Sequence, residues 1–162
     1  MTIMKAWYHL IAAIQYLFYR LVYGKQLYIG KGVTWRRGFS IMKTKDAIVK
    51  IGADCFFNND CSIAANNLVE IGDGTLFGEN VKIYDHNHRF RDDKSIKEQG
   101  YSNGNVYIGK HCWIGSNVVI LKGADISDNC VIGAGCVISG FVPSGMIVKN
   151  SENYKMIKIE KK

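Results

Sequence analysis

Large aliphatic or aromatic residues recur at every sixth position along most of this chain. From Ile108 to Ile138 the series runs without a break, and a small residue follows each member four places later. A fixed period over many units is typical of repeat architectures, in which each unit buries its apolar residues against its neighbours. The series comprises Ile29, Trp35, Ile41, Ile51, Phe57, Ile63, Ile71, Phe77, Ile83, Ile108, Ile114, Ile120, Ile126, Ile132 and Ile138.

Three interruptions of this series define the shape of the repeat. They follow Ile41, Ile63 and Ile83, each of which is the third member of a block. Three short strands therefore make one triangular coil of 18 residues, and all insertions leave from one corner. Fifteen units predict five coils of a parallel β-helix, in which successive coils pair as strands about 4.8 Å apart. Glycine directly after the large residue, as at Gly72 and Gly115, suits a tight corner.

This pattern resembles that of the hexapeptide-repeat acyltransferases over residues 27–148. The resemblance implies that the coils wind left-handed, whereas the general chirality of parallel strand connections favours a right-handed crossover. We therefore expect an all-β fold, a left-handed parallel β-helix of about five coils. The expected organisation is a helical segment at residues 1–26, the β-helix at residues 27–148 with an extruded loop at residues 89–107, and a basic tail at residues 149–162.

All five cysteines fall at the small inward position of the repeat. Their six-residue spacings reflect the period of the fold, and the chain has no C-x-x-C motif. We interpret them as packed core thiols rather than as disulfide partners or zinc ligands. Buried free thiols fit a reducing, cytoplasmic setting. The cysteines are Cys55, Cys61, Cys112, Cys130 and Cys136.

Residues 4–23 predict a helix that is apolar nearly all round. One interpretation is a cap over the end of the β-helix, where strand edges are unpaired, or a contact with a neighbouring subunit. The other is an interfacial helix that brings a basic, aromatic face to the inner membrane. The longest apolar run, Leu10 to Ile14, is far short of a membrane span, and no small-residue cleavage site follows it.

Basic charge is concentrated in the first third of the chain. Residues 1–50 contain nine Lys and Arg against Asp46 alone, a balance of +8, whereas residues 51–162 contain 12 basic and 13 acidic residues, a balance of −1. The basic end fits an acidic glycan, an anionic membrane surface or a simple solvated face. No nucleic-acid motif accompanies the charge, so we expect no nucleic-acid partner.

The candidate chemistry lies in the repeat unit before the longest interruption. In the six-residue frame Asp85, His86 and His88 occupy outward positions, so neither histidine belongs to the core. The polar insertion that follows is long for a compact repeat protein, and such loops are usually functional. An outward imidazole beside an overhanging loop is suited to general-base catalysis.

The resemblance assigns roles to these residues. In galactoside- and maltose-type acetyltransferases the catalytic histidine ends the hexapeptide before a projecting loop, and His88 matches that position. Asn58 matches an asparagine that holds the acceptor, and Asn66 stands where those enzymes have an aspartate. The D-H-x-H pattern is similar to that of O-antigen and capsule acetyltransferases. This implies that His86, with Asp85, helps to position the acceptor or the base.

Two further elements resemble the family's coenzyme-binding motifs. The run W-I-G-S begins at Trp113, and the I-G-A-G run contains Ala134. The resemblance implies that Trp113 lines the acetyl site and that Ser116 and Ala134 contact the pantetheine arm of acetyl-CoA. These two residues are 18 positions apart, so we expect them to stack on one face. The family's G-x-P-A-[KR] ending lacks its Pro and Ala here, which leaves Lys149 and Lys155 as candidates for the CoA 3′-phosphate.

Together these assignments predict acetyl transfer from acetyl-CoA, without a metal, to a sugar hydroxyl of a bacterial surface polysaccharide or its precursor. His88 closes a third strand and Trp113 a first strand, so a strand of roughly 20 Å separates them within one chain. The homotrimer that the resemblance implies, with sites between subunits, would bring them together. The main alternative is N-acetylation of a nucleotide-linked amino sugar on the same scaffold. A non-catalytic scaffold and a zinc hydratase are weaker alternatives, since His86, His88 and His111 lack the spacing of the γ-type carbonic anhydrases.

Overall fold

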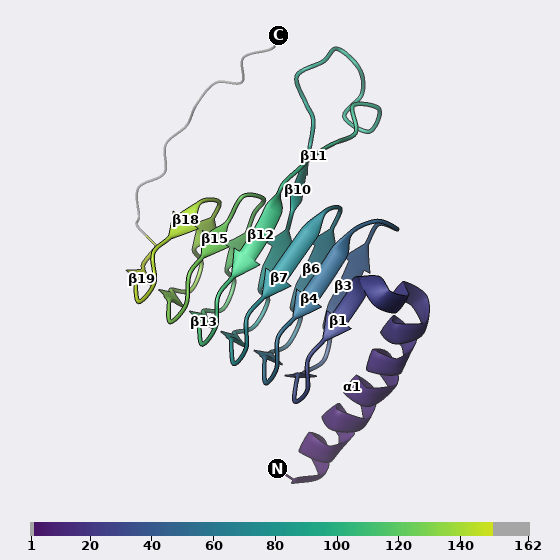
Figure 1. Cartoon of the computed structure of the whole chain (residues 1–162), viewed down its shortest axis with the longest axis vertical. Helices are drawn as coiled ribbons and strands as arrows, with labels where there is room; N and C mark the ends of the chain where they lie inside the picture. The colour runs from purple at the N-terminus through teal and green to yellow at the C-terminus, as the bar shows by residue number, and fades with distance from the viewer. Residues whose placement is uncertain (1, 151–162) are drawn as a thin grey trace.

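The chain forms a three-sided prism of stacked coils, which a computed structural model describes over residues 2–150, without the side chains of residues 2–6 and of His9 (Figure 1). The first sheet contains β1 (Leu27–Ile29), β4 (Ile48–Ile51), β7 (Leu68–Ile71), β12 (Asn105–Ile108), β15 (Asp125–Ile126) and β18 (Phe141–Val142). The second sheet contains β2 (Thr34–Trp35), β5 (Phe56–Phe57), β8 (Leu76–Phe77), β13 (Trp113–Ile114), β16 (Val131–Ile132) and β19 (Ile147–Val148). The third sheet contains β3 (Ser40–Lys43), β6 (Ser62–Ala65), β9 (Lys82–Tyr84), β14 (Val119–Ile120) and β17 (Val137–Ile138).

The predicted parallel β-helix is confirmed, and its coil count rises from five to about six. The last turn has only two strands in the described residues, β18 and β19, which extend the first and second sheets. Val142 pairs with Ile126 although it lies only four positions after Ile138. Because this spacing is two residues shorter than the regular period of six, the six-residue frame misses the last turn.

The interior of the prism is a continuous stack of inward side chains. Corresponding members of the period-six series lie side by side in neighbouring coils, as Ile114 and Ile132 do in the second sheet. Near the N-terminal end aromatic rings replace aliphatic residues, and the rings of Phe57 and Phe77 stack with centroids 4.4 Å apart. Each of these side chains has almost no exposed surface, so every coil contributes to one hydrophobic core.

The cysteines lie where the sequence predicted. All five are buried and free, and burial raises the pKa of the Cys55, Cys61, Cys112 and Cys136 thiols. Several thiols also contact a backbone carbonyl of the next coil, as Cys61 does with the oxygen of Gly78 at 3.1 Å. These thiols therefore act as small core side chains.

Tight corners join the three sheets and repeat from coil to coil. At the corner between the second and third sheets, Asn80 and Asn117 have positive φ angles of 56° and 59°, a conformation that Asn and Gly tolerate better than most residues. Their side chains hydrogen-bond to each other at 2.9 Å. Two positions before Asn117, a Cβ on Gly115 would lie 2.6 Å from the amide nitrogen of Ala134. Stacking thus requires glycine at Gly115 because the next coil passes too close.

The N-terminal helix α1 (Thr2–Tyr23), followed by a 3-10 turn (Gly24–Gln26), caps the first coil. Its polar side chains bind the free edge of β3: Tyr23 Oη donates to the Ile41 carbonyl at 2.9 Å, and the Ile41 amide donates to Tyr19 Oη at 3.1 Å. Gln15 donates to the Phe39 carbonyl at 2.7 Å. These bonds satisfy edge groups that would otherwise be unpaired, so the cap interpretation is confirmed. Over the described residues, no helix has the length and apolar continuity to cross a membrane.

Removing a core ring should destabilise the stack far more than removing an exposed one. Phe57→Ala is expected to lower the free energy of unfolding by about 3–5 kcal/mol, because the buried ring leaves a cavity beside Phe77. The matched control Phe141→Ala removes a ring that is 68% exposed and should cost less than about 1 kcal/mol. Chemical denaturation of both variants measures the difference, and equal losses would contradict the inward placement of Phe57.

Candidate active site

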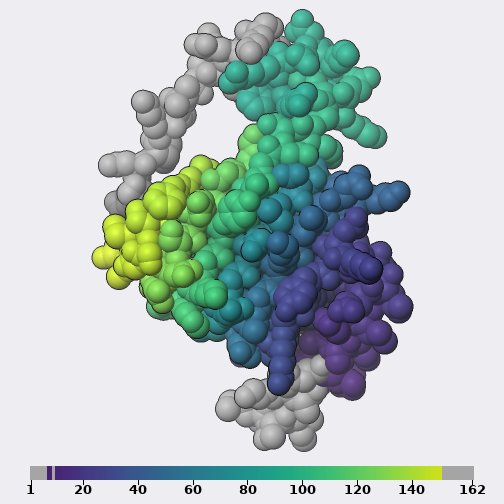
Figure 2. Space-filling model, viewed as in Figure 1, coloured from purple at the N-terminus to yellow at the C-terminus, as the bar shows by residue number. Residues whose placement is uncertain are grey.

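The long insertion leaves the prism at the corner between the third and first sheets as a β-hairpin. Its strands are β10 (His86–His88) and β11 (Tyr101–Asn103), which pair antiparallel with His88 opposite Tyr101. The loop between them stands out from the body (Figures 1 and 2). The predicted boundaries of 89–107 are therefore corrected at both ends. His86 to His88 already belong to the hairpin, and Asn105 begins strand β12 of the next coil.

The two candidate histidines lie on one face of this hairpin. Alternate residues of a strand point to the same side, so His86 and His88 both face Tyr101 across the pair. The Tyr101 ring centroid lies 5.1 Å from that of His86 and 4.6 Å from that of His88. His88 is exposed, whereas the His86 side chain retains 18% of its accessible surface. The hairpin thus presents two imidazoles and a phenol side by side.

The prediction that Asp85 points outward is wrong. Its side chain has no exposed surface, and its carboxylate accepts the backbone amides of Asn66 at 2.7 Å and Asn67 at 2.6 Å. The six-residue frame ends where the hairpin begins, so the backbone turns at Asp85 and brings the carboxylate inward against the corner of the preceding coil. A carboxylate enclosed in this way has no surface with which to contact an acceptor directly.

Asp85 instead holds His86. The His86 Nδ1 atom lies 2.9 Å from Asp85 Oδ1. An ionised carboxylate can only accept, so this contact favours the tautomer in which Nδ1 carries the proton and leaves Nε2 facing away from Asp85. A base oriented by a buried third group is a recurrent arrangement in acid–base and nucleophilic catalysis. His88 has its ring against Tyr101 and is the more exposed of the two imidazoles.

Sequence reasoning missed the residues that hold the hairpin in shape. Gln99 is 8% exposed and bonds to the Asp92 amide and carbonyl and to the Lys94 carbonyl, so it closes the loop from inside. Lys122, on the following coil, donates to Ser102 on β11. The polar insertion lacks the six-residue pattern of apolar residues, so the sequence does not indicate that Gln99 is buried while its neighbours are exposed. Tyr101 had a weak signal, as the aromatic residue after Gly100.

The predicted coenzyme residues lie at a different corner, between the second and third sheets. Ser116 and Ala134 stack one coil apart, as their spacing predicted, and the Ser116 carbonyl accepts the Gly135 amide at 2.9 Å. Ala134 is exposed, and Ser116 Oγ accepts the Glu79 amide at 3.1 Å. Trp113 is 59% exposed on the outer face of the second sheet. It begins strand β13 of that sheet, which corrects the expectation that it closes a first strand.

The remaining predicted residues divide between the two corners. Asn66 lies directly beneath the hairpin, with its amide on Asp85. Asn58 lies two coils before Gly115 at the Ser116 corner, and its Oδ1 accepts from Arg36 at 3.2 Å. Lys149 is exposed directly after β19, and Lys155 lies outside the described residues. Within one chain the third sheet therefore separates the histidine hairpin from the Ser116 corner.

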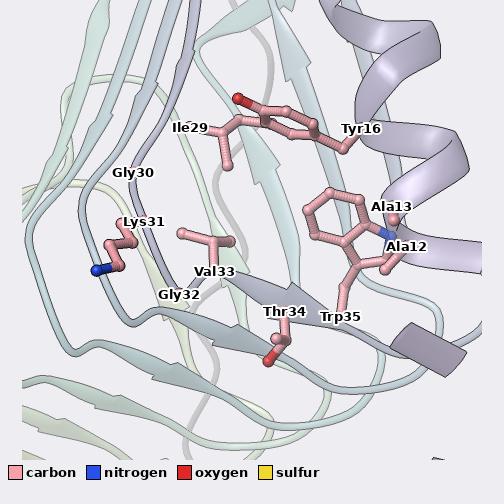
Figure 3. Close-up of a pocket in the computed structure, with 10 residues that line it drawn as sticks. All are labelled: Ala12, Ala13, Tyr16, Ile29, Gly30, Lys31, Gly32, Val33, Thr34 and Trp35. Atoms are coloured by element: carbon pink, nitrogen blue, oxygen red, sulfur yellow. The ribbon is translucent and has the colours of Figure 1, made fainter. Parts of the chain in front are cut away.

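The histidine hairpin lies apart from two hollows on the described part of the chain. One hollow of about 500 Å³ lies between α1 and the first coil (Figure 3), and another of about 450 Å³ lies along the first sheet beside Tyr107. No residue of the hairpin lines either hollow. Within residues 2–150, no three His, Cys, Asp or Glu side chains gather closely enough to hold a metal ion.

Comparison with known proteins explains this architecture. Residues 105–140 match the bacterial transferase hexapeptide (six repeats) family. This match and the acetyltransferase relatives described below support the hexapeptide-repeat acyltransferase family for this chain. A solved galactoside acetyltransferase in complex with coenzyme A is 26% identical, with a TM-score of 0.63 over 82% of this chain and 72% of that one. A hexapeptide-repeat acetyltransferase from Vibrio cholerae, complexed with acetyl-CoA, shares the fold with a TM-score of 0.68 at 22% identity, over 83% of this chain and 70% of that one. This agreement in fold supports the left-handed winding that the resemblance implied.

Three curated relatives align with this chain over smaller shares of their own length than the two solved structures do. The probable acetyltransferase Rv3034c of Mycobacterium tuberculosis is 34% identical over 76% of this chain and 39% of the relative. Galactoside O-acetyltransferase of Escherichia coli K12 is 33% identical over 61% of this chain and 48% of the relative. The putative lipopolysaccharide biosynthesis O-acetyl transferase WbbJ of Escherichia coli K12 is 31% identical over 56% and 50%. The chain thus spans about half the length of these relatives or less.

The buried Asp85 carboxylate should stabilise the base of the hairpin. Asp85→Ala is expected to lower the free energy of unfolding by about 2–5 kcal/mol, because two backbone amides each lose an acceptor worth about 1–3 kcal/mol. Amide hydrogen exchange at Asn66 and Asn67 should accelerate in parallel. Asp125→Ala, which removes an exposed carboxylate from β15, is the control and should change neither quantity. Unchanged protection of Asn66 in the Asp85 variant would contradict this anchoring role.

Proposed function

We propose that the protein transfers the acetyl group of acetyl-CoA to a hydroxyl of a sugar in a bacterial surface polysaccharide or its precursor. The observation that carries this proposal is the pair of imidazoles on a projecting hairpin, one exposed and one oriented by a buried carboxylate. Galactoside O-acetyltransferase and WbbJ, whose names describe O-acetyl transfer, support the hydroxyl acceptor and the polysaccharide context.

The corner between the second and third sheets fits the pantetheine arm of acetyl-CoA. Ser116 and Ala134 form a column parallel to the coil axis, because strand register repeats from coil to coil. The adjoining backbone amides pair with the next coil, so the arm would lie across the outside of this column rather than insert into it. Trp113 offers an exposed ring for the acetyl end, and Lys149 and Lys155 follow the last strand as candidates for the 3′-phosphate.

Acetyl-CoA supplies the acetyl group as a thioester. In the proposed reaction His88 accepts the proton of the acceptor hydroxyl while that oxygen bonds to the acetyl carbonyl carbon, and the same proton then goes to the departing sulfur. A donor near Trp113 and Ser116 stabilises the negative charge that develops on the carbonyl oxygen. His86, fixed through Nδ1 by Asp85, holds the acceptor through its free Nε2. Asn66 beneath the hairpin and Asn58 at the Ser116 corner of a neighbouring subunit are the further acceptor contacts in this proposal. No cysteine takes part, because all five thiols are enclosed in the core.

A homotrimer with sites between subunits would complete this active site. The histidine hairpin and the Ser116 corner lie on opposite sides of the third sheet, so a neighbouring subunit is needed to bring one to the other. The second sheet carries a column of outward apolar residues suited to such a contact, because these residues stand one above another in register. The column consists of Phe56, Leu76, Trp113, Val131 and Ile147.

A thiol-release assay with acetyl-CoA tests the reaction. His88→Asn should lower the rate by about 10²- to 10⁴-fold, the usual contribution of a general base. The matched control His111→Asn changes an exposed histidine with a φ of 55°, which Asn tolerates, and should retain full activity. A larger loss in His86→Asn than in His88→Asn would make His86 the base.

The acceptor panel separates the proposed reaction from its alternative. It should contain polysaccharides, simple galactosides and nucleotide-linked amino sugars. Turnover on hydroxyl acceptors that His88→Asn abolishes supports O-acetyl transfer. Turnover confined to amines would instead favour N-acetylation of a nucleotide-linked amino sugar. Absence of both turnover and CoA binding by calorimetry would overturn the proposed function.

The apolar column of the second sheet should control assembly. Leu76→Lys, at a side chain that is 47% exposed beside Trp113, is expected to convert trimers into monomers and to abolish activity without unfolding the core. A desolvated lysine in a subunit contact would cost several kcal/mol. Size-exclusion chromatography with light scattering measures the change. Ile48→Lys, which is 41% exposed on the first sheet, is the control and should leave the oligomer intact. Dissociation of both variants alike would argue against a contact through the second sheet.

A further inference from the structure

Helix α1 has a second apolar face that the prism does not use. Its inner face packs on the first coil through Ala12 and Tyr19, which are 7% and 5% exposed. The opposite face repeats large apolar residues every three or four positions, so they gather on one side of the helix. Eight adjacent exposed apolar side chains are far more than the scattered ones that need no explanation. The outer face consists of Trp7, Leu10, Ile11, Ile14, Leu17, Phe18, Leu21 and Val22, each between 41% and 78% exposed.

The helix also leaves part of the prism end uncovered. The hollow of about 500 Å³ beside α1 is lined largely by apolar groups, with the rings of Tyr16 and Trp35 on one side and Ile29 and Val33 on the other (Figure 3). A cap that served only to seal the core would close this hollow. Within the described residues, the N-terminal end of the prism therefore presents two apolar surfaces that nothing covers, the hollow and the outer face of α1.

Positive charge surrounds these surfaces. The chain has no Asp or Glu before Asp46. Arg20 on α1 and the basic residues in and beside the first coil are exposed or half-buried, and none of them forms an ion pair with a carboxylate of the described part. The excess charge is thus available to an external partner. These basic residues are Lys25 in the 3-10 turn, Lys31, Arg36, Arg37 and Lys43 in the first coil, and Lys45 directly after it.

We propose that this end of the prism docks on an anionic lipid surface, with the outer face of α1 lying in the plane of the interface. An apolar helix face flanked by Lys and Arg is the arrangement that gains both from burial in the headgroup region and from attraction to acidic lipids. The inner face of α1 stays on the prism, because Tyr19, Tyr23 and Gln15 remain bonded to the edge of β3.

A second copy of the chain fits this face less well. Two such ends meeting face to face would bring together two sets of at least six cations that form no ion pair within the described residues, and this repulsion opposes association. The apolar column of the second sheet, which includes Leu76 and Trp113, offers self-association a separate and less charged surface. The docking inference does not depend on the proposed acetyl transfer, since it concerns another end of the molecule.

Flotation of the full-length protein with vesicles tests the proposal. Vesicles of phosphatidylcholine with a quarter of phosphatidylglycerol should bind the protein, and pure phosphatidylcholine vesicles should bind it much more weakly. Ile14→Gln/Leu17→Gln/Leu21→Gln alters three exposed residues of the outer face and should lower the partition coefficient at least tenfold. Circular dichroism and thermal unfolding should show that this variant remains folded, because its three sites lie outside the core.

A matched pair of charge variants separates a specific docking end from general attraction to a basic protein. Lys25→Gln/Arg36→Gln/Arg37→Gln removes three charges from the 3-10 turn and the first coil and should weaken binding roughly a hundredfold, at about tenfold or less per basic residue near an acidic surface. Arg91→Gln/Lys94→Gln/Lys97→Gln removes three exposed charges from the hairpin loop and should change binding less than about threefold, since charges beyond a Debye length of the lipid are screened.

Three results would overturn the proposal. The first is absence of wild-type binding to the acidic vesicles, and the second is equal weakening by the two charge variants. The third is a change of oligomeric state in the outer-face variant by light scattering, which would assign that face to a second copy. The acetyl-CoA assay, run without lipid, reports the proposed function separately, so vesicle binding without turnover, or turnover without binding, tells the two proposals apart.

Discussion

Register between coils is the constraint on which the rest of this structure depends. Each strand of two to four residues is too short to be stable alone, and it gains stability only when its backbone pairs with the coils before and after it. That pairing places Ile51, Ile71 and Ile108 in one inward column, and equivalent columns fill the prism from the other two sheets. The same pairing explains the close glycines, because Gly115 lies where the backbone of the next coil leaves no space for a Cβ.

Fixed register also decides where chemistry can lie. A residue inserted inside a strand would move every later side chain to the wrong face, whereas an insertion at a corner leaves the columns intact. The hairpin therefore leaves from the corner after Tyr84. There the Asp85 carboxylate accepts hydrogen bonds from the backbone amides of Asn66 and Asn67 in the preceding coil. The same contact orients His86, so one buried carboxylate joins the stability of the scaffold to the geometry of the candidate site.

At the two ends of a β-helix the terminal coil has a neighbouring coil on one side only, so the backbone groups of its outer edge are unpaired. At the N-terminal end α1 supplies hydroxyl and amide groups to the free edge of β3 and covers part of the core. Helix α1 is apolar on two faces, and capping buries only the inner one. The cap and the interfacial helix, which seemed to be competing interpretations of residues 4–23, are thus compatible with each other on opposite faces of one element.

The sequence by itself determined the coil, because a six-residue period records which side chains face inward regardless of any long-range detail. It located the inward cysteines, the corner that carries the insertion and the stacking of Ser116 on Ala134. Only the tertiary structure decided the direction of Asp85, the bonds of Gln99 and the shortened corner before Val142. These features lie where the six-residue period stops. There the backbone path depends on contacts between segments whose separation along the chain is not set by the repeat. The six-residue frame gives the face of a residue only while the repeat continues. The candidate site lies on an interruption of the repeat, so only the tertiary structure decides its geometry.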